Sequence, residues 1–177
     1  MIKLKNNAQA PKFKKDNYLG EKINLKEYEG KKILLSFFRG ASCAFCNLRI
    51  NELIKKYPEF EKNKIYIIAF FAASKDEISK YAGNRTTPFP IIPDPNLEIY
   101  KKYAIEESYL GMFNMILKPL KVIDIMLKGL FNVKSITDNA LIPADFLIDE
   151  KQNIYRSYYG KDLSDHLEID DILCWRK

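Results

Sequence analysis

The sequence predicts an α/β fold in which a helix connects two parallel strands. Two continuous apolar runs, Ile33–Phe38 and Lys64–Ser74, are bounded by turn residues, which is typical of strands buried on both faces. Between them, apolar residues recur at helical spacing from Ala44 to Tyr57. The unit from Ile33 to Phe71 therefore reads as a strand-helix-strand crossover with two parallel neighbours.

Length and composition favour one globular domain over residues 1–177. The chain is 47% hydrophobic and 13% aromatic, which is enough for a well-buried core. Twenty-nine Lys and Arg residues against 23 Asp and Glu residues give a net charge of +6, but the basic residues are spread along the chain beside acidic ones. This distribution favours a solvated surface and argues against a nucleic-acid partner.

The first residues of the chain bear on a targeting signal, and the whole sequence bears on a membrane-spanning run. The first residues, Met1–Asn7, contain no apolar run followed by a small-residue cleavage site, so we expect no secretory signal. No stretch reaches the roughly 18 apolar residues of a membrane-spanning helix. We therefore expect a cytoplasmic protein without a transmembrane segment, whose thiols are kept reduced.

Turn residues and proline predict the segments before the strand-helix-strand unit and the ends of its helices. Residues 1–20 read as an extended arm, and Ile23 and Leu25 alternate before a turn at Gly30. Pro58 is expected to end the first helix, because proline has no N–H to donate. Gly83 is expected to cap a short second helix.

The second half of the chain is expected to add the remaining strands. Ile91 and Ile92, set among prolines, allow only a brief strand, and residues 96–103 form a helix of two turns. Residues 144–149 and 154–159 are separated by "EKQN" and predict an antiparallel hairpin. A last helix is expected near Ile169–Trp175.

One segment does not fit this plan. Tyr109–Lys134 is rich in Met, Leu, Ile and Phe, carries four lysines, and is broken by Pro119 and Gly129. We expect a helical insertion that packs on the sheet or at a subunit interface, which leaves a homodimer open. The alternatives are a lid over the cysteines or a lipid-facing surface.

Two of the three cysteines stand where the first strand gives way to the first helix. Cys43 and Cys46 form a Cys-x-x-Cys pair in the first helical turn, where unpaired N–H groups and the helix dipole stabilise a thiolate. Their spacing allows a disulfide to form and reopen with little backbone movement. Arg39 precedes the turn and could add a positive charge. The pattern predicts redox chemistry.

Three other interpretations of the pair are weaker. A zinc site would need two further ligands, and His166 and Cys174 at the far end of the chain are the remaining candidates. A structural disulfide across so short a loop would constrain the unfolded chain little. Inert buried thiols are not expected, because Ser42, Ala44 and Asn47 do not form an apolar pocket. We expect neither a metal nor another cofactor.

These motifs together resemble the thioredoxin superfamily, and in it the peroxiredoxin-like branch of alkyl hydroperoxide reductase and thiol-specific antioxidant proteins (AhpC/TSA). The resemblance is carried by "LGEKINLKEYEGKKILLSFFRG", "SCAFC", "PFPIIPDPNLEIYKKYAI" and "IPADFLIDEKQNIYRSYYGKDLSDHL", in that order. It implies a three-layer α/β/α sandwich around a mixed central sheet, and a redox-active antioxidant enzyme.

The sequence departs from true peroxiredoxins at three places. If Cys46 matches their peroxide-attacking cysteine, Cys43 takes the place of a Thr or Ser, and Arg39 that of a Pro. Pro143 stands where they have an arginine, and it resembles the cis-proline that faces the cysteine pair in thioredoxins. The resemblance therefore implies a cis Ile142–Pro143 bond that presents backbone groups to a bound partner.

Which cysteine attacks first stays open, because the thioredoxin pattern assigns an exposed, attacking role to Cys43 and the peroxiredoxin pattern assigns attack to Cys46. Cys174 is expected to be a spare thiol. His166, with Asp162 and Asp165 nearby, is expected to cap or pack the last helix rather than to act in catalysis.

Two functions follow from this pattern. The first is a thiol oxidoreductase that reduces peroxides or protein disulfides through a Cys43–Cys46 dithiol, with Arg39 and Pro143 at the site. A thioredoxin- or glutathione-type donor would then recycle it. The alternative is a non-enzymatic redox sensor or interaction module, in which the same pair shifts the Tyr109–Lys134 segment.

Overall fold

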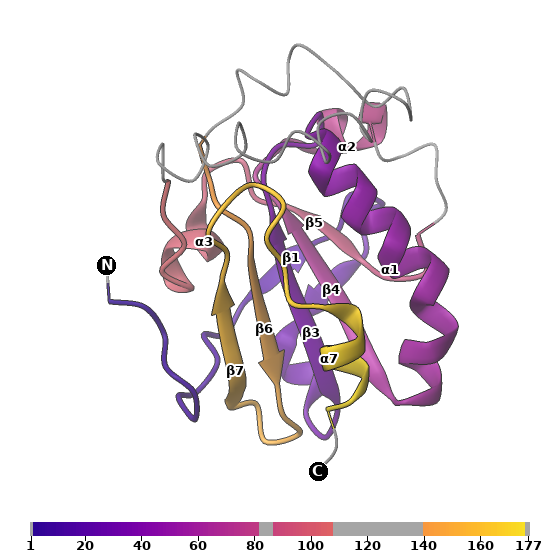
Figure 1. Cartoon of the computed structure of the whole chain (residues 1–177). Coiled ribbons are helices and arrows are strands. Elements are labelled where there is room, and N and C mark those ends of the chain that lie inside the picture. The colour runs from indigo at the N-terminus through magenta and orange to yellow at the C-terminus, as the bar shows by residue number, and fades with distance from the viewer. Residues whose placement is uncertain (1, 82–86, 108–139, 176–177) are drawn as a thin grey trace.

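A computed structural model describes residues 2–81, 87–107 and 140–175 (Figure 1). The elements follow one another as β1 (Lys14–Asp16), β2 (Lys22–Asn24), the 3-10 helix η1 (Leu25–Tyr28), β3 (Lys32–Phe38), α1 (Ala44–Lys62), β4 (Ile65–Phe71), α2 (Lys75–Tyr81), β5 (Ile91–Pro93), α3 (Glu98–Lys102), β6 (Ala144–Ile148), β7 (Ile154–Tyr159) and α7 (Ile169–Leu173).

The main sheet has five strands in the order β5-β4-β3-β6-β7, and β1 pairs with β2 in a separate ribbon. Strand β3 runs parallel to β4 and antiparallel to β6, and β4 runs parallel to β5. The sheet is therefore mixed, and β3 lies at its centre. The predicted crossover from β3 through α1 to β4 and the predicted β6-β7 hairpin are both confirmed.

Alternation along the strands divides the core into two apolar clusters, one on each face of the sheet. On β3, Leu34 and Phe38 belong to the cluster that includes residues of α1 and α7. Ile33, Leu35 and Phe37 belong to the cluster on the opposite face, which includes residues of α3 and η1. This arrangement explains the unbroken apolar run of β3, since both of its faces are covered.

Helix α1 is longer than the sequence predicts. It runs through Pro58 to Lys62, so the expectation that Pro58 ends it was wrong. Proline removes the N–H that would bond to the carbonyl of Ile54, which weakens the helix at that point. Phe60, beyond the proline, is completely buried in the same cluster as the rest of α1. Packing of Phe60 therefore compensates for the missing hydrogen bond.

The Ile142–Pro143 peptide bond is trans, and the expected cis bond was wrong. Strand β6 begins at Ala144, directly after the proline. A proline at the entry of a strand does not interrupt the ladder, because the sheet needs no N–H from it. Its carbonyl does take part in the fold, accepting a hydrogen bond from the N–H of Gly160 at 2.9 Å.

Two sequence predictions lie outside the described residues: the cap at Gly83 and the helical insertion at Tyr109–Lys134. The redox-sensor alternative depends on that insertion. Among the described helices, none is both long and apolar enough to cross a membrane.

Candidate active site at the start of helix α1

The first turn of α1 begins where β3 ends, at the carboxyl edge of the sheet. Residues 39–42 connect the two elements, and Cys43 is the N-cap of α1. The side-chain amide of Asn47 donates to the carbonyls of Ala41 and Cys43, both at 2.9 Å. The N–H of Cys43 donates to the carbonyl of Gly40 at 3.1 Å. These bonds fix the position of the Cys43 side chain relative to the helix.

Two N–H groups point at the sulfur of Cys43. The backbone N–H of Cys46 donates to Sγ at 3.4 Å, so a sulfur takes the place that an oxygen usually has in an N-cap. The guanidinium Nη1 of Arg39 lies 3.8 Å from the same sulfur. Both donors stabilise a negative charge on the sulfur more than they stabilise the neutral thiol.

The two thiols differ in acidity for this reason. A hydrogen bond from the Cys46 side chain is the largest influence on Cys43, and with the charge of Arg39 it lowers the pKa of Cys43 to about 7 although burial acts against it. Burial raises the pKa of Cys46 well above its ordinary value, and the neighbouring Cys43 raises it further. A substantial share of Cys43 is thus thiolate at neutral pH, whereas Cys46 keeps its proton.

Both cysteines are buried, which the sequence did not predict. Each is only 1% exposed, and both belong to the apolar cluster that includes Phe38 and Phe71. The expectation of a site without an apolar pocket was therefore wrong, and Cys43 is not exposed as the thioredoxin pattern implied. The apolar neighbours come from β3 and β4, so the polar residues adjacent in sequence gave no indication of them.

The remaining candidate, Pro143, is next in sequence to Ile142, which packs close to the cysteine loop. Ile142 and Leu163 form a small apolar cluster, and Phe45, one of the two residues between the cysteines, packs against it. The sequence therefore identified three residues that come together in space, Arg39, Cys43 and Cys46, and a fourth at a neighbouring position.

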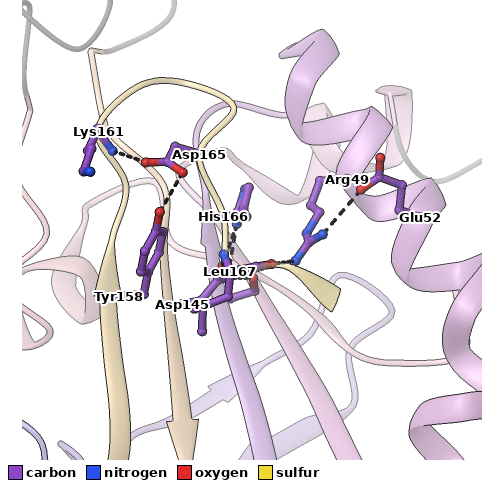
Figure 2. A network of polar contacts seen from close by, with 9 residues as sticks. Arg49, Glu52, Asp145, Tyr158, Lys161, Asp165, His166 and Leu167 are labelled. Carbon is purple, nitrogen blue, oxygen red and sulfur yellow. Dashed lines mark hydrogen bonds and ion pairs between the residues drawn. The ribbon is translucent and has the colours of Figure 1, made fainter. Parts of the chain in front are cut away.

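A second polar cluster, which the sequence analysis missed, lies on the α1 face of the sheet (Figure 2). The carboxylate of Asp145 in β6 faces the imidazole of His166, with 3.0 Å between Oδ2 and Nδ1. The N–H of Leu167 donates to Oδ2 at 2.8 Å, and the hydroxyl of Ser36 donates to Oδ1. Arg49 of α1 closes the cluster by donating to the carbonyl of Leu167.

These contacts determine the ionisation of Asp145. Burial alone would raise the pKa of its carboxyl group, but His166, Arg49 and Ser36 together lower it below its ordinary value. Asp145 is therefore a buried carboxylate that links β6 and β3 to α1 and the segment before α7. The sequence neighbours of His166 have other donors: Asp162 accepts hydrogen bonds from Ser164, and Asp165 accepts hydrogen bonds from Tyr158 and Lys161.

A signal for this cluster was present in the sequence. Asp145 interrupts a run that otherwise reads as a buried strand, and Ser36 does the same in β3. Polar side chains buried in a sheet need partners, because an unpaired one is costly. The antiparallel register pairs Ser36 directly with Asp145.

Comparison with known proteins agrees with this arrangement. The family model described as the AhpC/TSA family matches residues 7–156. The chain belongs to the AhpC/TSA family. The resemblance inferred from the sequence is thereby confirmed, and the match includes β1 to β6 together with the Cys43–Cys46 corner.

Curated relatives of this AhpC/TSA protein carry two kinds of name. The thiol-disulfide oxidoreductase ResA of Bacillus thuringiensis subsp. konkukian is 29% identical over 104 residues, which are 58% of this chain and 60% of that protein. Peroxiredoxin Bcp of Escherichia coli K12 is 23% identical over 113 residues, which are 63% of this chain and 72% of that protein. The chain thus spans about 60% of the length of the first of these relatives.

Solved structures show the same fold. Peroxidoxin BcpB of Mycobacterium tuberculosis superposes with a TM-score of 0.72 at 13% identity, covering 98% of this chain and 99% of that one. The reduced 2-Cys peroxiredoxin of Plasmodium vivax gives a TM-score of 0.67 at 18% identity, covering 95% and 78%. The predicted thioredoxin-like α/β fold with a mixed central sheet is confirmed.

The zinc interpretation has no geometric support in the described part of the chain, where no three His, Cys, Asp or Glu side chains are grouped to hold a metal. His166 is directed at Asp145, and Cys174 is exposed at the end of α7.

Proposed function

We propose that this AhpC/TSA protein is a thiol-dependent oxidoreductase in which Cys43 attacks the oxidant and Cys46 resolves the intermediate. The observation that carries this proposal is the contrast between the two thiols. Cys43 has a pKa lowered to about 7 by the Cys46 and Arg39 contacts, whereas the pKa of Cys46 is raised. A thiolate beside a protonated partner thiol is the arrangement that a dithiol cycle needs.

With a hydroperoxide, the Cys43 thiolate attacks the terminal oxygen and the O–O bond breaks. Cys43 becomes a sulfenic acid, and the alkoxide or hydroxide that leaves takes up a proton to give an alcohol or water. Cys46 then attacks the Cys43 sulfur, the S–O bond breaks, and water leaves as the disulfide forms. Arg39 is placed to stabilise negative charge on the sulfur and on the leaving oxygen.

With a disulfide substrate the same two sulfurs act in the same order. Cys43 forms a mixed disulfide and releases one thiolate, and Cys46 displaces the second thiol as the Cys43–Cys46 disulfide forms. In either case two electrons leave the protein. A dithiol donor, or two molecules of a monothiol donor, must return them, so the cycle fits a reducing compartment such as the cytoplasm.

Burial of the pair favours a small oxidant. Cys43 is 1% exposed, so a folded protein disulfide could reach it only after the first turn of α1 and its surroundings move. A hydroperoxide of a few heavy atoms needs a much smaller opening. We therefore infer that hydroperoxides react faster than protein disulfides with the reduced protein.

The experiment is a single-turnover reaction of the reduced protein with one equivalent of hydrogen peroxide. Of the three thiols in the chain, two should be lost, and mass spectrometry should find them joined as Cys43–Cys46. Cys46→Ser should stop at a Cys43 sulfenic acid that a dimedone probe traps. Cys43→Ser should not react at a comparable rate.

Cys174→Ser is the matched control, because this exposed thiol has no part in the proposed cycle. It should react at the wild-type rate. Full activity in Cys43→Ser, or a disulfide that includes Cys174 in the wild type, would show that the roles assigned to the pair are wrong.

A further inference from the structure

A cavity of about 220 Å³ opens between α1 and the segment that leads into α7, beside the cysteine loop. Its walls include Phe45, Leu48, Arg49 and Glu52 from one face of α1, together with Ser164, His166 and Glu168. Phe45 stands between Cys43 and Cys46 in the sequence, so one wall of the cavity comes from the helical turn that holds the redox pair. The geometry points to a binding site for the amino-acid head group of a small thiol.

The size of the cavity limits the occupant. About 220 Å³ is the space of roughly seven waters at about 30 Å³ each. Pockets for complete drug-sized ligands hold about 300–1,000 Å³. The cavity thus fits a group of a few heavy atoms, such as an amino acid, while the rest of the ligand extends toward the cysteines.

Arg49 supplies a donor for a carboxylate. Its side chain is buried, and its Nη atoms contact Glu52 at 3.4 Å and the carbonyl of Leu167. Among the described residues, its Nε has no hydrogen-bond partner. A buried guanidinium N–H left without an acceptor is costly, and a ligand carboxylate in this cavity would provide the acceptor.

Glu168 supplies the opposite charge. This exposed residue is the N-cap of α7, yet its side chain makes no capping hydrogen bond. Its carboxylate lies in the wall of the cavity, where it can accept from an ammonium group. The walls thus contain the guanidinium of Arg49, with Glu52 at 3.4 Å from one of its Nη atoms, and the second glutamate Glu168. A ligand that carries both an α-carboxylate for the Nε of Arg49 and an α-ammonium group for Glu168 matches this arrangement.

The apolar part of the wall points toward sulfur chemistry. Phe45 and Leu48 lie one helical turn before Arg49 and Glu52 on the same face of α1, toward the end of the helix that holds the cysteines. They would cover the methylene groups that separate a γ-glutamyl head from a cysteine sulfur. This inference rests on the proposed function, and it names the class of donor: a low-molecular-weight thiol of the γ-glutamyl type.

The test measures binding without redox chemistry. A Cys43→Ser/Cys46→Ser protein is titrated with S-methylglutathione and followed by amide shifts in nuclear magnetic resonance. We expect saturable shifts at Phe45, Leu48 and Ser164 at millimolar concentrations. S-methylcysteinylglycine, which lacks the γ-glutamyl head, should bind about tenfold more weakly or worse, since a charge-assisted contact is lost.

Variants of residues in the cavity wall provide the second part of the binding test. Glu168→Gln should weaken S-methylglutathione binding by about tenfold, and Arg49→Lys should do the same if it folds. Glu59→Gln, on the same helix and away from the cavity, is the control and should bind like the parent. Because Glu168 is exposed, its variant keeps the test decisive even if Arg49→Lys is unstable.

Two results would overturn the inference: no saturable binding of S-methylglutathione, or equal affinity for the peptide without the γ-glutamyl head. Unchanged affinity in Glu168→Gln would also count against it. None of these results bears on the peroxide reaction of Cys43, which is measured with the unmodified cysteines. Loss of that reaction in turn would leave the binding result standing, so the two failures are distinguishable.

Discussion

The backbone N–H of Cys46 donates a hydrogen bond to Sγ of Cys43 at 3.4 Å, so the second cysteine of the pair helps to ionise the first. The same geometry holds the two sulfurs within one turn of α1. Acidity and the ability to form a disulfide therefore have a common structural origin.

The first prediction concerns the titration of Cys43. The ultraviolet absorbance of its thiolate should appear with a midpoint near the pKa of about 7. Cys46→Ala should raise this midpoint, and Arg39→Gln should raise it less, because the Cys46 contact is the larger influence. Arg156→Gln, at an exposed position on β7, is the control and should leave the midpoint unchanged.

The sign of the effect on stability follows from the same pKa. The folded value lies below the value of about 8.5 for an unfolded cysteine. The Cys43 thiolate therefore contributes its full stabilisation of the folded protein above the unfolded pKa of about 8.5. This contribution is lost as the pH falls through about 7. A Cys43→Ser protein that kept the wild-type pH dependence of unfolding between these limits would contradict the assignment.

The second prediction concerns the buried carboxylate of Asp145. Asp145→Ala removes the acceptor for Ser36, His166 and Leu167, and it should lower the free energy of unfolding by about 3 kcal/mol. Denaturant unfolding measures the loss. Asp171→Asn, whose exposed contact with Arg156 spans 3.5 Å, should change stability by less than about 0.5 kcal/mol.

The pH dependence of unfolding in acid should also report on the carboxyl group of Asp145. The pKa of Asp145 is lowered in the folded protein, so its contribution is present above the unfolded value of about 3.9 and is lost as the pH falls through the lower folded value. Wild-type stability should therefore fall more steeply in this acidic range than that of Asp145→Ala. Parallel curves for the two proteins would mean that Asp145 is not a buried carboxylate.

The third prediction concerns the approach of two loops. A methyl group at Gly160 would lie 2.4 Å from the carbonyl oxygen of Asp165 and 2.9 Å from that of Pro143. Both are backbone atoms, so Gly160→Ala must separate the loops, and we expect a loss of about 2 kcal/mol in unfolding free energy. Lys161→Ala, the exposed neighbour, is the control. Wild-type stability in Gly160→Ala would show that the two loops have room to spare.

The fourth prediction concerns Tyr100 of α3. Its hydroxyl lies 2.5 Å from the carbonyl oxygen of Phe38 and 2.9 Å from that of Phe70. Tyr100→Phe preserves the shape of the side chain and should cost about 1–2 kcal/mol in thermal or denaturant unfolding. Tyr155→Phe, at a position 49% exposed, is the matched control. Equal effects of the two substitutions would contradict a structural role for the buried hydroxyl.

The crossover from β3 through α1 to β4 was predictable because local patterns carry it. β3 and β4 are apolar throughout, and the residues between them repeat at helical spacing, so the crossover follows from short-range rules. Pro58 shows where such rules fail. Whether a helix continues through a proline depends on Phe60, and the partners of Phe60 in the core are distant in sequence.

In the candidate site, too, some features were predictable from the sequence and others were not. Cys43, Cys46 and Arg39 are close in sequence, and their contact was predictable from the helix start alone. The burial of the pair was not, because the apolar walls come from two strands. The Asp145–His166 contact joins β6 to the segment before α7, and without knowledge of the sheet register the nearer Asp162 and Asp165 were the natural partners to choose.

The central place of β3 has a consequence for how the thiols are reached. This strand is hydrogen-bonded on both sides and covered on both faces, so its amides should exchange with solvent only when the whole molecule unfolds. Fraying of the sheet thus gives no route to Cys43. Any oxidant must arrive through small excursions of the α1 amino end or of the loops around it, so the opening rate reported by amide exchange there would set the upper limit on the rate at which Cys43 is oxidised.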